Sequence, residues 1–121
     1  MSDARLENCS FQRATIDCCF ADFAAFEGCV FDEATIFVSV FAGSRFRKSR
    51  FVGATADQCN FNAIDARDID FSDASLKRSR FINSRLTAVT FANCDLRDAF
   101  FQFSLRKDVA FKYSNDDEAF F

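Results

Sequence analysis

Large apolar residues recur at every fifth position along almost the whole chain. The series begins at Leu6 and reaches Phe121 without a change of register, and it takes in thirteen of the nineteen Phe. Of its twenty-four positions, only Arg106 and Asp116 are polar. A second series, which begins at Ala4 two residues before the first, holds small or aliphatic side chains throughout. The repeating unit is therefore small-x-large-x-x.

A period of five residues fits neither a helix nor a continuous strand. On a helix, five residues rotate the side chain by about 500°, so the large residues would not form a stripe. On a strand, a step of five moves the side chain to the opposite face each time. Within one unit the small and large residues are two apart, and they share a face if the chain is extended. The pattern predicts an extended chain that turns a corner every five residues.

Four such corners close a square coil of twenty residues, and two features of the sequence agree with stacked coils. The chain has no Pro, as expected if neighbouring coils use nearly every backbone N–H. All three Gly lie two residues after a large residue, at the corner, where an unusual backbone conformation is needed.

Charges provide a further test of the twenty-residue coil, because residues twenty apart would stack at about 4.8 Å. Opposite charges coincide at nine such places and like charges at four. The nine pairs are Arg13/Glu33, Glu27/Arg47, Arg45/Asp65, Lys48/Asp68, Arg50/Asp70, Asp57/Lys77, Asp65/Arg85, Arg78/Asp98 and Arg97/Asp117.

The tandem small-x-large-x-x units, from Ala4 to Phe121, resemble the pentapeptide-repeat family. The resemblance implies an all-β fold, a right-handed quadrilateral parallel β-helix of about six coils, with residues 1–121 as a single solenoid domain. Two opposite interior columns are aromatic and form the predicted core. They are Phe11, Phe31, Phe51, Phe71, Phe91 and Phe111 on one side, and Phe41, Phe61, Phe81 and Phe101 on the other.

Composition limits the chemistry available. The net charge is −3 and there is no long apolar run, so we expect a cytoplasmic protein without a membrane or nucleic-acid partner. The chain lacks His, the usual general base, and it has no phosphate-binding loop or metal motif. We therefore expect no enzyme activity, no cofactor and no metal. Five of the six Cys occupy small inward positions, and Cys18 alone points outward; we expect reduced thiols.

One side of the predicted solenoid is unusual, because its outward positions hold several Phe and only two charges, Asp22 and Arg80. The C-terminal end is also unusual, since Arg106 and Asp116 occupy inward positions; either they pair across the interior or the last coil frays. We predict a homodimer that covers the C-terminal end, this side, or both. The candidate interface residues are Phe20, Phe23, Phe100, Phe103, Tyr113, Phe120 and Phe121.

The leading hypothesis for function is a non-catalytic interaction module or scaffold that binds a second copy or another protein. The basic segment RFRKSR, residues 45–50, is interpreted as a solvent-facing surface and not a nucleic-acid site, because three of its four basic residues have an Asp one coil on.

The family resemblance supplies an alternative. Some pentapeptide-repeat proteins mimic DNA and bind or protect DNA gyrase, and several of those carry loops that this chain lacks. Acidic residues do gather in the N-terminal part of this chain, which is the feature that favours the alternative. They are Asp17, Asp22, Glu27, Asp32 and Glu33.

Overall fold

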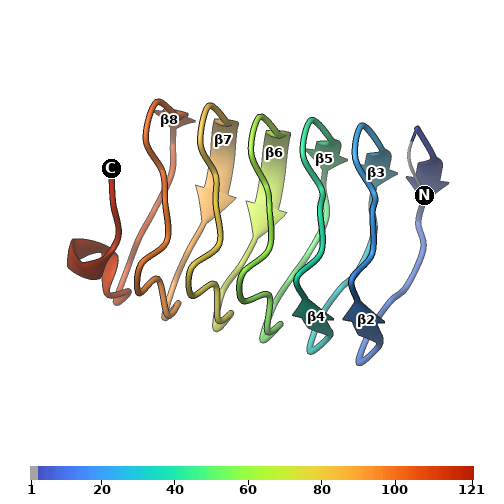
Figure 1. Cartoon of the computed structure of the whole chain (residues 1–121), viewed down its shortest axis with the longest axis horizontal. Coiled ribbons are helices and arrows are strands. Elements are labelled where there is room, and N and C mark those ends of the chain that lie inside the picture. Colours follow the sequence, from blue (N-terminus) through green and yellow to red (C-terminus); the bar gives the residue numbers. More distant parts are fainter. Residues whose placement is uncertain (1–2) are drawn as a thin grey trace.

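The computed structural model describes residues 3–121, which wind into a stack of four-sided coils (Figure 1). One side is a parallel sheet of six strands, and a second side contains a pair of strands. The two ends of the chain lie at opposite ends of the stack (Figure 1). In stacking order the six strands are β1 (Arg5–Glu7), β3 (Ala25–Glu27), β5 (Arg45–Arg47), β6 (Asp65–Asp70), β7 (Arg85–Thr90) and β8 (Leu105–Lys107), and the pair is β2 (Thr15–Asp17) and β4 (Thr35–Phe37).

Every pairing joins residues twenty apart, which confirms the predicted coil. Leu6 pairs with Phe26, and Phe26 with Phe46, in parallel register. Isolated bridges continue the same register along the other sides of the stack. The six stacked strands are linked by five coils, so the described chain makes about five turns and not the six that were expected. The quadrilateral parallel β-helix itself is confirmed.

A left-handed backbone conformation marks each corner from Asp3 to Tyr113. The residue two positions after each large inward residue has a positive φ, whatever its type. Even the β-branched Val38 adopts φ 45°, a conformation that is rare for such residues. At many corners the next amide closes a turn, as where the Ala34 N–H donates to the Phe31 carbonyl at 3.1 Å. A positive φ at the third residue of such a turn is typical of type II.

The interior is filled by stacked phenylalanine rings. The Phe71 ring lies 4.7 Å from that of Phe51 in the same column and makes an edge contact with Phe61 of the opposite column, at 6.2 Å. Eight of the ten predicted core Phe are buried. Phe11 and Phe111 are partly exposed, because they lie in the end coils and have a neighbouring ring in their column on one side only.

Buried serines in the small inward positions bond to the preceding coil. The Ser44 hydroxyl donates to the Ala21 carbonyl at 2.8 Å and accepts from the Ala24 N–H at 3.1 Å. Ser79 makes the same two contacts with Ala56 and Cys59. Within residues 3–121 no buried side-chain nitrogen or oxygen lacks a partner, so these polar groups are buried without the cost of a lost hydrogen bond.

The last coil departs from the repeat. A 3-10 helix, η1 (Asp116–Glu118), replaces the extended chain on the side that carries β2 and β4. Arg106 is exposed, and its guanidinium lies over the Phe121 ring, 4.7 Å from the centroid. The described residues show no ion pair between Arg106 and Asp116. A cation–π contact therefore takes the place of the charge pair that was considered across the interior.

None of the helical segments in residues 3–121 has the length and apolar character needed to span a membrane.

We expect Phe71→Ala to lower the free energy of unfolding by about 3–5 kcal/mol, because it leaves a cavity between two stacked rings. Phe111→Ala, the matched control in the same column, should cost clearly less because Phe111 is already partly exposed. Chemical denaturation followed by circular dichroism measures both. Equal losses for the two variants would contradict the continuous column.

Candidate interaction surface

Five of the seven candidate interface residues lie on one side of the solenoid. Backbone bridges link the outward residues of this side, one from each coil, into a single ladder that runs along the stack. A row of corner residues, from Phe23 to Phe103, runs beside the ladder. We call the ladder and this row the aromatic face. The ladder is Phe20, Val40, Asn60, Arg80, Phe100 and Phe120, and the row is Phe23, Gly43, Ala63, Asn83 and Phe103.

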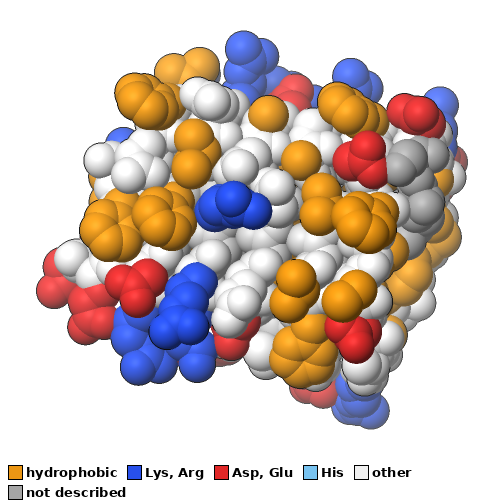
Figure 2. Space-filling model, in the orientation of Figure 1, with side chains coloured by type: hydrophobic (Ala, Val, Ile, Leu, Met, Phe, Trp, Pro, Cys, Tyr) orange, Lys and Arg blue, Asp and Glu red, His pale blue; other side chains and the backbone are white. Residues whose placement is uncertain are grey.

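Hydrophobic side chains gather toward both ends of the aromatic face. Phe20 and Phe23 are 65% and 66% exposed near one end, and Phe103 is 84% exposed near the other. In the space-filling view, orange groups lie on both sides of a single blue side chain in the middle (Figure 2). The positions between the aromatic ends are small, polar or singly charged, with Asn60 and Arg80 at the centre of the ladder.

Local packing orders the rings at both ends. The Phe23 ring lies over the corner glycine Gly43, where a Cβ atom would come within 2.6 Å of it. Two features favour glycine at this corner. Its φ is +71°, which other residues rarely adopt, and the Phe23 ring occupies the space that a side chain would need. At the other end, the rings of Phe100 and Phe120 stack with centroids 5.0 Å apart. These contacts position Phe23, Phe100 and Phe120 before any partner binds.

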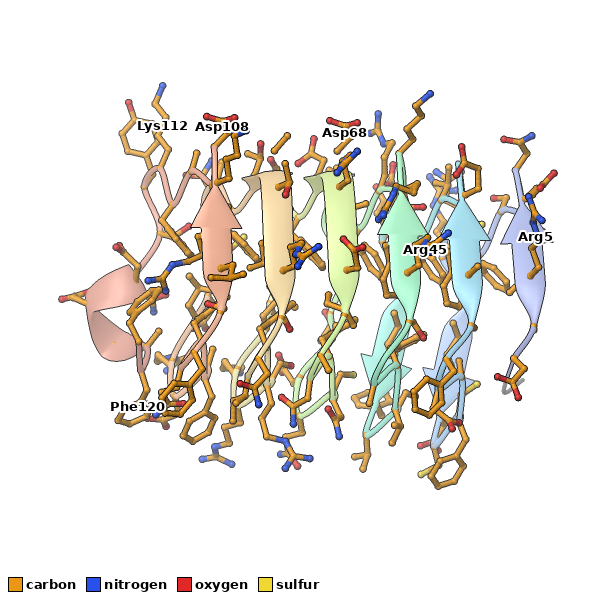
Figure 3. The ribbon with its side chains drawn as sticks, turned by 90° about the horizontal axis from the view of Figure 1, so that it is seen from above. Arg5, Arg45, Asp68, Asp108, Lys112 and Phe120 are labelled. Carbon is orange, nitrogen blue, oxygen red and sulfur yellow. The ribbon has the colours of Figure 1, made fainter. Side chains whose placement is uncertain are left out.

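The remaining two candidates, Tyr113 and Phe121, lie elsewhere. Phe121 continues an interior column, stacked on Phe101 at 5.2 Å and half exposed at the open end. Tyr113 is a corner residue whose ring is contacted by the Lys112 ammonium at 5.2 Å. Lys112 and Phe120 project from opposite sides of the stack (Figure 3). The seven candidates thus form one face plus separate contacts at the C-terminal end, and not one continuous patch.

A family model for pentapeptide repeats, in eight copies, matches residues 64–102. The chain therefore carries pentapeptide repeats. A comparison with curated proteins finds no significant match.

Solved structures of other proteins share the solenoid. A trypsin-treated variant of QnrB1, described as a plasmid-mediated fluoroquinolone resistance protein, superposes with a TM-score of 0.75 at 18% identity, covering 99% of this chain and 68% of that one. A second such variant gives 0.72 at 18%, over 100% and 69%. Rfr23, a pentapeptide-repeat protein from the cyanobacterium Cyanothece 51142, gives 0.53 at 12%, over 95% and 89%. At these identities the likeness shows a common fold.

Charged side chains on the other sides of the pentapeptide-repeat solenoid pair differently from the prediction. Only Arg13 with Glu33, at 2.9 Å, and Asp57 with Lys77, at 3.7 Å, form predicted pairs among the described residues. Other arginine side chains pair with a carboxylate that is not the one predicted. The observed pairs of this kind are Arg5 with Glu7, Arg47 with Asp65, Arg50 with Asp32, and Arg97 with Asp95.

The basic segment at residues 45–50 is consequently less neutralised than expected. Asp65 lies beside Arg45 on the next coil, but its carboxylate binds Arg47 instead, at 3.0 Å. Three arginines on this sheet are exposed and form no ion pair in the described structure: Arg45, Arg67 and Arg85. Arg45 is labelled in Figure 3. This side is therefore basic at its centre although the chain is acidic overall.

Asp95 has the largest pKa shift among the carboxylates of residues 3–121. The hydrogen bond from the Arg97 guanidinium lowers its pKa to about 2 against the effect of burial, and the Asn115 amide adds a second bond at 3.2 Å. The pair lies on the surface beside η1, so we interpret it as a support for the last coil and not as catalytic chemistry.

The cysteines have no chemistry of their own in this arrangement. All six are free. Burial raises the pKa of both Cys59 and Cys94 to about 11, which keeps these thiols protonated. The exposed Cys18 donates a hydrogen bond to Asp17, whose carboxylate raises the pKa of the thiol. A thiol in that state is a poor nucleophile.

Three exposed large apolar residues, Phe37, Val38 and Leu105, were not among the sequence-based candidates. Phe37 and Val38 are 44% and 57% exposed, on the side that carries β2 and β4, and Leu105 is 63% exposed in β8. The five-residue period could have found them, because Phe37 follows the inward Ile36 and must point outward.

Proposed function

We propose that this pentapeptide-repeat protein is a non-catalytic interaction module that binds protein through its aromatic face. The partner is either a second copy of the chain or another protein. The observation that carries the proposal is the aromatic residues at both ends of one flat β-surface, with one cation between them. Phe20 and Phe23 are exposed at one end, and the exposed Phe103 and Phe120 flank the half-buried Phe100 at the other. Such patches are typical of protein interfaces.

The rigidity of the scaffold supports the proposal. Neighbouring coils are joined by main-chain hydrogen bonds on each side, and the column of rings beneath the aromatic face, from Phe41 to Phe101, is buried. Side chains on such a surface lose little further freedom on binding, so more of the contact energy is available for affinity. The absence of His from the sequence and the protonated, buried thiols support a role without catalysis.

A comparison of two baits tests this function. One bait is the wild-type protein and the other carries Phe20→Glu and Phe100→Glu, which add charge to both ends of the aromatic face without changing an inward residue. We expect wild type to retain at least one protein, itself included, from its native cell extract, and the variant to lose it. Phe37→Glu, on a different side, is the control. Identical binding by the two baits would contradict the proposal.

The gyrase alternative has weaker support. Of the acidic residues that favoured it, Asp32 and Glu33 are neutralised by Arg50 and Arg13. Among the described residues, the sheet that carries β5, β6 and β7 presents unpaired arginines, which a mimic of the DNA phosphate backbone would not have on that side. The likeness to QnrB1 supplies a common fold at 18% identity.

We therefore expect no effect of micromolar protein on plasmid supercoiling by DNA gyrase, either alone or in the presence of a quinolone. Protection from the drug or inhibition of supercoiling would favour the DNA-mimic alternative over the interaction module.

A further inference from the structure

The order of residues along the ladder of the aromatic face is nearly the same when it is read from either end. From the N-terminal end the ladder begins with Phe20, Val40 and Asn60. From the C-terminal end it begins with Phe120, Phe100 and Arg80. Apolar residues thus occupy both outer thirds, and the two polar residues, Asn60 and Arg80, meet at the middle. A surface with this order can be complementary to itself, as a two-fold interface requires.

We propose that two copies of the chain pack antiparallel through their aromatic faces, with the two-fold axis crossing the ladder between Asn60 and Arg80. The inference rests on the proposed function and identifies its partner as a second copy. In this arrangement Phe20 faces Phe120 of the other copy and Val40 faces its Phe100. At the centre, the Arg80 guanidinium of each copy donates to the amide oxygen of Asn60 in the other.

Charge selects the antiparallel arrangement. If the two rods were parallel, each Arg80 would face the Arg80 of the other copy, and like charges across an interface are costly. Arg80 is exposed and forms no ion pair within residues 3–121, so no carboxylate of its own chain would offset that repulsion. The antiparallel arrangement separates the two cations and gives each an acceptor.

Register selects the position of the axis. Moving it by half a coil to Asn60 would place Val40 against Arg80 of the other copy, and moving it to Arg80 would bring the two arginines together. Only the position between them matches every apolar residue of the ladder with another apolar residue. Such a match in both orientation and register is what distinguishes a specific interface from a merely hydrophobic surface.

The residues beside the ladder are compatible with the same operation. Phe103 of one copy comes to lie next to Phe23 and Gly43 of the other, where an aromatic ring already covers the glycine. Asp22 belongs to a row whose later members are Ala42, Asn62, Ile82 and Gln102. In the antiparallel dimer Asp22 would face the position one coil beyond Gln102 of the other copy. The row ends at Gln102, so Asp22 is not buried against an apolar residue of the other copy.

The size of the face sets the expected affinity. Five steps between coils make it about 24 Å long, and five residues of extended chain make it at most about 17 Å wide. The resulting area, at most about 400 Å², is well below the roughly 800 Å² per partner of a standard interface. We therefore expect a reversible dimer with a dissociation constant in the micromolar range, populated at high local concentration.

A charge-pair experiment tests the facing residues directly. Val40→Arg and Phe100→Glu each place one charge against an apolar residue of the other copy, and each should weaken self-association more than about tenfold. The double variant should regain it, because the arginine introduced at position 40 of each copy then faces the glutamate introduced at position 100 of the other. Both positions point outward, so the interior is unchanged. Phe37→Glu, on another side, should leave self-association at the wild-type level.

Sedimentation velocity over a micromolar concentration series measures association, and circular dichroism verifies that each variant is folded. Loss in both single variants with recovery in the double variant is the predicted result. A monomeric wild type, dimerisation unaffected by the single variants, or no recovery in the folded double variant would each overturn the antiparallel pairing. A monomeric wild type that still retains another protein through Phe20 and Phe100 would overturn this inference and leave the proposed function standing.

Discussion

The structure depends on a backbone constraint: every fifth residue takes a left-handed conformation. From Asp3 to Tyr113 the chain turns at each of these positions, even where the residue is Val38. Because left-handed φ costs about 1–2 kcal/mol at residues other than Gly, the sequence does not favour most corners locally. Apolar burial in the interior offsets this cost. The corners close a twenty-residue coil, in which each large residue is buried against the large residue twenty positions earlier. Ring stacking and corner geometry are therefore one cooperative unit.

Closing the coil also determines how the surface is organised. Two of every five residues point inward, so the outward residues form straight ladders on flat sides, and the character of each side follows from which residues recur twenty apart. One side is basic at its centre, around Arg45 and Arg67, while another is apolar at both ends, around Phe20 and Phe100. The inward serines bond to the preceding coil, which lets the interior hold hydroxyl groups without loss of stability. A rigid rod with unlike sides suits binding more readily than catalysis.

The sequence alone predicted the parts of the structure that the repeat dictates. The coil length, the inward columns and the corner positions all follow from one periodicity, which twenty-four units repeat without slipping. The ion pairs were largely missed, because a long side chain can reach a carboxylate other than the one stacked twenty residues away, as Arg47 reaches Asp65. The last coil was missed because η1 breaks the repeat, and Arg106 found the Phe121 ring instead of Asp116. The sequence also predicted that Tyr113 is exposed, and the structure places it at a different corner from the aromatic face.

The most direct test of the four-cornered coil is the thermal stability of two internal deletions. Removing residues 46–65 takes out one whole coil, so every later residue keeps its column and Phe71 still stacks on Phe31. Removing residues 46–50 preserves the five-residue pattern but rotates the rest of the chain by one side, so that Ala56 replaces Phe51 above Phe31. The account predicts a cooperative transition close to that of the full chain for the longer deletion and a much lower one for the shorter. A shorter deletion as stable as the longer one would contradict it.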